Sequence, residues 1–102
     1  MSRFDNPEEF ELLTDCQKEA LLEFCNSLEK IKSFNTRHTS YGLKHIFESL
    51  YRKELHDERF GSSISNGDFK GAMLKAGFDV KDEESLNWVF NISEKSIKNL
   101  DK

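Results

Sequence analysis

The chain has 102 residues, 36% of them hydrophobic and 33% charged, with nine Phe, two Tyr and one Trp. This size suits one domain around one hydrophobic core and excludes two independent domains, and the aromatic content argues against disorder. No apolar run approaches the ~18 residues of a membrane-spanning helix, and residues 1–11 are acidic rather than a basic leader segment, so we expect a cytoplasmic protein without membrane contact.

The net charge of −4 is unevenly distributed along the chain. Residues 1–29 carry two basic and eight acidic side chains, residues 30–53 carry six and one, and residues 54–102 carry seven and ten. An acidic first helix beside a basic second helix would explain this pattern without any ligand. The alternative is a patch in residues 30–53 that faces an anion.

Two helix starts are expected in the first part of the chain. Asn6 followed by Pro7 and two Glu residues indicates a short capped helix. Thr14 and Gln17 form a capping-box pattern, and apolar residues follow at helical spacing, so we expect a helix from Asp15 to Ser33. Its solvent side would carry Glu19, Glu23 and Lys30. Its Cys16 and Cys25 would lie on opposite faces, too far apart to form a disulfide bond.

A polar loop over residues 35–39 precedes a second expected helix, with Ser40 as its N-cap and an end near Leu55 or His56. Its spacing predicts one buried side and one solvent side. The buried side would hold Leu43, Ile46, Phe47, Leu50 and Tyr51, and the solvent side Lys44, Glu48, Arg52 and Lys53.

A third helix is predicted from Gly67 to Ala76, with the cap residues in Ser65-Asn66-Gly67-Asp68. Gly77 stands where a left-handed residue ends a helix, and Phe78 would fold back onto Met73 or Leu74. A charged loop over residues 79–85 follows.

Apolar and other residues alternate from Leu86 to Ile92, which predicts a strand, and Phe60 to Ile64 is its natural partner. Ser93 would cap a short terminal helix that carries Ile97 and Leu100. The predicted fold is therefore a mainly helical (α+β) compact domain with three to five helices and a small two-stranded β-hairpin-like element, an arrangement open to a winged-helix-like fold. We expect one domain over residues 1–102, with an N-terminal helical segment at 1–34 and a core module at 35–102.

Residues capable of catalysis or metal binding form no known pattern in this sequence. The candidates are Cys16, Cys25, His38, His45, His56 and the scattered acidic residues. There is no Cys-x-x-Cys pair, no His-Glu-x-x-His, no Gly-rich phosphate loop and no nucleophile elbow. The His and Cys separations match no usual zinc site. We therefore expect no enzyme activity, no metal and no cofactor, with the histidines as polar surface residues.

Three short motifs resemble a known group of proteins. They are His38-Thr39-Ser40-Tyr41-Gly42-Leu43-Lys44-His45, Ile64-Ser65-Asn66-Gly67-Asp68-Phe69 and Ala76-Gly77-Phe78. The chain resembles, over about Asn35 to Ile92, a group of small proteins from bacterial genomes, plasmids and prophages. The resemblance implies a setting in a phage or mobile element and no particular activity, and it carries over no catalytic residue.

One function that fits the sequence is a non-catalytic protein that binds a host or element-encoded protein. In a phage setting this class includes inhibitors of host defence enzymes such as CRISPR effectors. Acidic side chains would imitate nucleic-acid phosphates toward a basic partner, with an exposed Phe4, Phe10 or Phe34 as anchor. The acidic residues are Glu8, Glu9, Glu11, Asp15, Glu19 and Glu23. A solvated helix face would explain the same pattern without any partner.

The alternative function is a helix-turn-helix or winged-helix-like DNA-binding regulator. Residues 40–55 would support residues 66–77 in the major groove. The candidate DNA contacts are Arg37, Lys44, Arg52, Lys53, Asn66, Lys70 and Lys75. Two observations weaken this hypothesis: the connector over residues 54–65 is far longer than that of a helix-turn-helix, and Asp68 would face phosphate.

Overall fold

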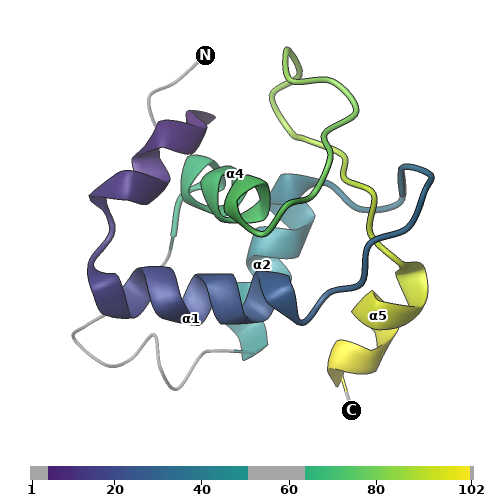
Figure 1. Ribbon diagram of the computed structural model, residues 1–102, viewed down its shortest axis with the longest axis horizontal. Helices are drawn as coiled ribbons and strands as arrows, with labels where there is room; N and C mark the ends of the chain where they lie inside the picture. The colour runs from purple at the N-terminus through teal and green to yellow at the C-terminus, as the bar shows by residue number, and fades with distance from the viewer. Residues whose placement is uncertain (1–4, 51–63, 102) are drawn as a thin grey trace.

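Residues 5–50 and 64–101 are described by the computed structural model, and they form six helical elements (Figure 1). In chain order these are the 3-10 helix η2 (Pro7–Leu12), α1 (Asp15–Asn26), α2 (Ser40–Leu50), α4 (Asn66–Lys75), α5 (Glu94–Lys98) and the 3-10 helix η3 (Asn99–Asp101). The predicted mainly helical class is confirmed. The predicted end of the second helix near Leu55 or His56 lies outside the described residues.

The predicted starts of the first two helices are confirmed. Asn6 Oδ1 accepts a hydrogen bond from the Glu8 N–H at 2.9 Å, which caps η2. At α1 the capping box is reciprocal, because Gln17 N–H donates to Thr14 Oγ1 at 3.2 Å and Thr14 N–H donates to Gln17 Oε1 at 2.9 Å. Each bond satisfies a backbone donor that the first turn of a helix leaves unpaired.

The first α-helix ends at Asn26, so the prediction that it continues to Ser33 is wrong. Ser27 Oγ donates to Phe24 O at 2.6 Å, and the chain then leaves the helix axis. Ile31 N–H donates to Asn91 O at 3.0 Å, and Lys30 forms an antiparallel bridge with Ile92. Backbone pairing with this distant segment replaces the helical hydrogen bonds. We call residues 27–39, which join α1 to α2, the linker.

Helix α2 begins at Ser40, but Ser40 is not the capping residue. Thr39 Oγ1 accepts from the Gly42 N–H at 3.4 Å, so Thr39 takes that position. Ser40 is buried, and it exchanges two hydrogen bonds with Trp88: its N–H donates to Trp88 O at 2.8 Å, and its Oγ accepts from Trp88 N–H at 3.0 Å. The predicted cap is thus used for a long-range contact.

Both predicted ends of the helix that contains Asn66 are close to those observed. Ser65 caps α4 in a reciprocal box with Asp68, at 3.0 Å and 2.8 Å. At its other end Gly77 has a φ of 89°, its N–H donates to Leu74 O at 3.0 Å, and Phe78 N–H donates to Met73 O at 3.1 Å. This is the predicted stop with a left-handed glycine, and Phe78 is buried.

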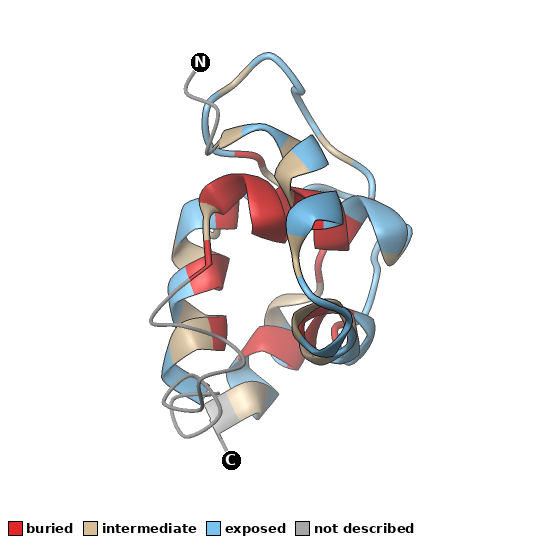
Figure 2. Ribbon diagram, turned by 90° about the vertical axis from the view of Figure 1, so that its left-hand side faces the viewer, coloured by how far each residue is buried: buried red, intermediate tan, exposed pale blue. Residues whose placement is uncertain are grey.

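Helix α4 lies at the centre of the fold, against η2, α1 and α2 (Figure 1). Every residue from Asn66 to Met73 is buried (Figure 2). Gly67 and Gly71 allow this close approach, because a Cβ atom on Gly67 would overlap the backbone of Asn6 and one on Gly71 would overlap Phe10. The first helical segment therefore packs directly on the backbone of α4.

The predicted strand is an extended segment that makes isolated bridges. Lys30 pairs with Ile92, and Val80 pairs with Phe90. The predicted partner, Phe60 to Ile64, falls mostly on residues 60–63, outside the described residues, so the two-stranded element and the winged-helix-like arrangement stay predictions. Ser93 caps α5 as predicted, accepting from the Ser96 N–H at 3.3 Å.

Aromatic side chains form the centre of the core. The ring of Phe24 lies 5.3 Å from that of Phe47 and 6.1 Å from that of Phe69, and Phe90 lies 6.5 Å from Phe69. The radius of gyration of 12.7 Å is that of a compact chain of this length. Within residues 5–50 and 64–101, no helix has the length and apolar character to span a bilayer.

Candidate protein-binding surface

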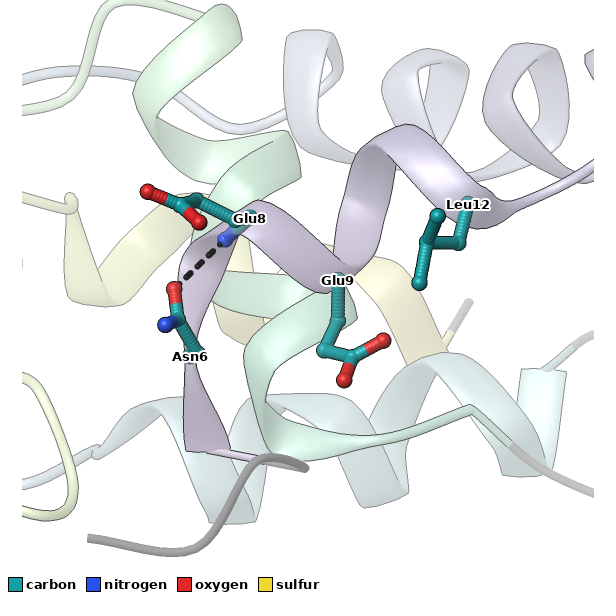
Figure 3. Close-up of a pocket in the computed structure, with 4 residues that line it drawn as sticks. All are labelled: Asn6, Glu8, Glu9 and Leu12. Carbon is teal, nitrogen blue, oxygen red and sulfur yellow. Dashed lines mark hydrogen bonds between the residues drawn. The ribbon is translucent and has the colours of Figure 1, made fainter.

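The predicted acidic residues lie on two consecutive elements, η2 and α1. In η2 the three-residue period of a 3-10 helix turns Phe10 into the core. The same period puts Glu9 and Leu12 on one side of the helix, and both project from that side in Figure 3. Glu8 and Glu11 occupy another side, and both are exposed.

A shallow pocket of about 220 Å³ opens on η2, lined by Asn6, Glu8, Glu9 and Leu12 (Figure 3). We call it the η2 pocket. Leu12 is 74% exposed, the highest value among the exposed large hydrophobic residues of the described chain. Glu8 is exposed and Glu9 is half-buried. The pocket therefore combines a solvent-facing leucine with two carboxylates.

Glu11, beside the pocket, is neutralised by lysines. Lys75 Nζ lies 3.0 Å from Glu11 Oε1, and Lys18 Nζ lies 3.7 Å from Oε2. The hydrogen bond from Lys75 is the main cause that lowers the pKa of the Glu11 carboxyl. The expected uniform acidic face is thus interrupted at this residue.

The acidic residues of α1 form a separate row. Asp15, Glu19 and Glu23 follow one another at intervals of four residues, which puts them on one side of the helix, and all three are exposed. The predicted solvent positions of Glu19 and Glu23 are confirmed. The opposite side of α1 buries Leu21, Phe24 and Cys25.

The sequence did not identify Leu12 as a contact residue. The aromatic candidates for that role do not occupy the η2 pocket: Phe10 is 2% exposed and part of the core, and Phe4 lies outside the described residues. Phe34 is 38% exposed but belongs to the linker. One feature of the sequence could have indicated its exposure. Leu12 is three residues after Glu9, so in a 3-10 helix with Phe10 in the core it lies on the same side as Glu9.

The structure corrects the predicted DNA contacts of α4. Asn66 is 7% exposed and Lys70 is 0% exposed, so the prediction that both point outward is wrong. Lys70 Nζ donates to Asp5 O at 2.9 Å and lies 4.9 Å from the centre of the Trp88 ring. Burial lowers the pKa of the Lys70 ammonium group, with the Asp5 charge acting in the opposite direction.

Asn66 belongs to the same buried polar network. Its Nδ2 donates to Asn87 Oδ1 at 3.0 Å and to Asp5 Oδ1 at 3.1 Å. Its Oδ1 is buried without a hydrogen-bond partner among the described residues. Asn66 and Lys70 therefore hold Asp5, which precedes η2, against the segment that contains Asn87 and Trp88. Neither side chain is placed to contact DNA.

The other predicted DNA contacts do not form one exposed basic surface among the described residues. Lys44 is 7% exposed, which corrects its expected outward position, and its Nζ pairs with Glu48 Oε1 at 3.1 Å. Glu48, predicted on the solvent side, is half-buried. Lys75 is exposed but pairs with Glu11. Arg37 is exposed on the linker. Arg52 and Lys53 lie outside the described residues.

Two histidines pair with carboxylates. His38 Nε2 lies 3.0 Å from Glu94 Oε1, and Asn35 Nδ2 donates to the same oxygen at 3.1 Å. The Asn35 hydrogen bond and then the His38 contact lower the pKa of the Glu94 carboxyl. His45 Nδ1 lies 3.2 Å from Glu48 Oε1, and its side chain is 54% exposed, as predicted for a surface histidine. His56 lies outside the described residues.

The two cysteines are free thiols in different environments. Cys16 is exposed and Cys25 is buried, which agrees with the prediction that they occupy opposite faces of one helix. Burial raises the pKa of the Cys25 thiol. Among residues 5–50 and 64–101, no three His, Cys, Asp or Glu side chains are grouped closely enough to hold a metal ion.

Comparisons of the chain with protein-family models, with curated proteins and with solved structures found no match.

Proposed function

We propose that this chain is a non-catalytic cytoplasmic protein that binds a basic partner protein through the η2 pocket. The observation that carries the proposal is the exposure of Leu12, at 74%, on the edge of a pocket that Glu8 and Glu9 also line. Covering one leucine side chain contributes about 1.5–3 kcal/mol, enough for an anchor residue in an interface.

The charge around Leu12 favours a basic partner. Carboxylates at the edge of an interface mainly raise the association rate and select partners of opposite charge. Asp15, Glu19 and Glu23 add a separate row of exposed carboxylates on α1, the next helix along the chain. In the phage or mobile-element setting that the sequence resemblance implies, an enzyme of host defence with a basic nucleic-acid channel is a partner of this kind.

The alternative function, DNA recognition by residues 66–77, has weaker support. It needs Asn66 and Lys70 at a protein surface, whereas α4 uses both to hold the fold together. The exposed lysine of α4, Lys75, pairs with Glu11, so this helix offers little free positive charge to a major groove.

Site-specific photo-crosslinking tests the proposed function. A photo-reactive residue at position 12 is compared with the same residue at position 86, because Leu86 is also a leucine with high exposure, at 53%, and follows the acidic residues Asp82, Glu83 and Glu84. We expect position 12 to give a covalent adduct in host cells that position 86 does not give. Glu8→Lys should reduce the yield of this adduct, because a cation there repels a basic partner. Equal adducts at both positions, or none at position 12, would reject the η2 pocket as a binding site.

A further inference from the structure

A second surface of the molecule is assembled from the linker and α5. The two segments are far apart in sequence and lie side by side (Figure 1). Glu29 N–H donates to Ser96 Oγ at 3.2 Å, and Ser93 N–H donates to Glu29 O at 2.8 Å. At the other end of the linker, His38 and Asn35 both contact Glu94.

Cations predominate on these two segments. Residues 27–39 and 93–98 contain five Lys or Arg and two Glu. One of the two carboxylates, Glu94, is already engaged by Asn35 and His38. Lys32 and Arg37 on the linker are exposed, as are Lys95 and Lys98 on the outer side of α5, where Ser96 and Ile97 face inward.

Exposed hydrophobic side chains lie among these cations. Phe34 is 38% exposed and Ile31 is 39% exposed. Phe34 stands between Lys32 and Arg37 in sequence, and all three side chains are exposed on the linker. An aromatic ring beside cations is the combination that binds the face of a nucleobase and the phosphate next to it.

The backbone around residues 31–35 of the linker is fixed, although the side chains of residues 31–34 are exposed. Ile31 N–H donates to Asn91 O at 3.0 Å, and Asn91 Nδ2 donates back to Ile31 O at 3.0 Å. Asn35 N–H donates to Phe90 O at 3.0 Å, and Asn35 Nδ2 donates to Ile92 O at 3.2 Å. Residues 32–34 are therefore held between two anchored positions, which reduces the entropy that a ligand must pay to order them.

We propose that this basic surface, made of Lys32, Phe34 and Arg37 of the linker and Lys95 and Lys98 of α5, binds single-stranded nucleic acid. A single strand offers base faces to Phe34, whereas a duplex keeps its bases stacked and offers mainly phosphates. The proposal goes beyond the proposed function and uses different residues, so either can fail without the other.

Fluorescence anisotropy with a labelled oligothymidine strand of about 16 nucleotides tests this proposal. We expect binding at about 50 mM salt that weakens steeply by about 200 mM, because phosphate contacts release counterions. Lys32→Glu combined with Arg37→Glu should weaken binding at least about tenfold. Phe34→Ala should weaken it about tenfold, and Phe34→Trp should retain it, because either aromatic ring stacks on a base.

The control is Lys75→Glu at a 55% exposed lysine beside η2, which shifts the net charge by as much as Lys32→Glu alone does. It should leave the affinity within about twofold of the unmodified chain, because Lys75 is not part of the basic surface. Three results would overturn the proposal: no binding at low salt, unchanged binding by Phe34→Ala, or displacement of the strand by polyglutamate as effectively as by unlabelled strand. The last result would show that the surface binds an acidic polypeptide as well as it binds a nucleic-acid strand.

Discussion

The η2 pocket and the basic surface are attached to the core in different ways. Helix η2 is held by close packing, because Phe10 is buried and Gly67 and Gly71 let the helix backbones meet. The linker is held by hydrogen bonds from Asn35 and Asn91 to backbone atoms of other segments. The position of η2 therefore depends on close packing of side chains and backbone, whereas the position of the linker depends on hydrogen bonds of Asn35 and Asn91. Each should be removable without disturbing the other.

Gly71→Ala should have the largest effect, and it should act on the η2 side. The new methyl group would overlap Phe10 and Pro7, and overpacking of this kind costs about 3 kcal/mol in free energy of unfolding. Urea denaturation measures the loss. Gly42→Ala is the matched control, because a Cβ there meets its nearest atom, Thr39 Oγ1, at 3.9 Å, so we expect no loss of stability. Equal losses at the two glycines would contradict the close contact between η2 and α4.

Asn91→Ala should have the next largest effect, and it should act on the linker. Asn91 is 7% exposed, its Nδ2 donates to Ile31 O, and its Oδ1 accepts from Asp79 N–H at 2.8 Å. Removal leaves two backbone groups unpaired, and we expect a loss of about 2 kcal/mol. Amide hydrogen exchange should accelerate in residues 29–37 and remain unchanged in residues 7–12. Acceleration in both segments would show that the two surfaces are not independent.

Acid should weaken the contact between the linker and α5 through Glu94. The pKa of Glu94 is lowered from its ordinary 4.5, so the folded state binds fewer protons than the unfolded state does. The stabilising contribution is complete above the unfolded value and is lost as the pH falls through the folded value. Unfolding midpoints measured from about pH 6 to about pH 3 should fall less steeply for Glu94→Gln than for the unmodified chain. Parallel curves would show that ionisation of Glu94 does not stabilise the folded state.

Lys75→Gln should have the smallest effect. Its partner Glu11 is 56% exposed, and exposed ion pairs contribute little to stability. We expect no resolvable change in the urea midpoint, whereas Gly71→Ala on the same helix should change it strongly. A loss as large as that of Gly71→Ala would mean that charge, and not packing, holds η2 against α4.

The helix ends that depend on neighbouring residues were predicted correctly, and the end that depends on a long-range contact was not. The capping boxes at Thr14 and Ser65 and the Gly77 stop depend on residues within a few positions of each other, so they follow from the sequence. The end of α1 depends on the pairing of Lys30 with Ile92, about sixty residues away. No periodicity in residues 15–33 reports that contact.

The same reason explains which predicted site residues changed role. Lys70 has the spacing of an outward residue, but Asp5 and Trp88 come from both ends of the chain to enclose it. The exposure of the acidic residues of α1 was predictable from their spacing, but their separation from those of η2 was not, because Glu11 between them pairs with Lys18 and Lys75. The basic surface was not predictable from the sequence. Lys95 and Lys98 lie near the linker because Ser93 and Ser96 form hydrogen bonds with Glu29, more than sixty residues earlier.

An NMR titration of the isotope-labelled chain tests most directly whether the η2 pocket and the basic surface are separate binding surfaces. A short Lys- and Leu-rich peptide should shift amide signals in residues 6–13, and oligothymidine should shift those in residues 30–37 and 94–98. Signals of residues 66–73 of α4 should stay in place with both probes. Shifts from both probes that centre on the same residues, or on α4, would contradict the account.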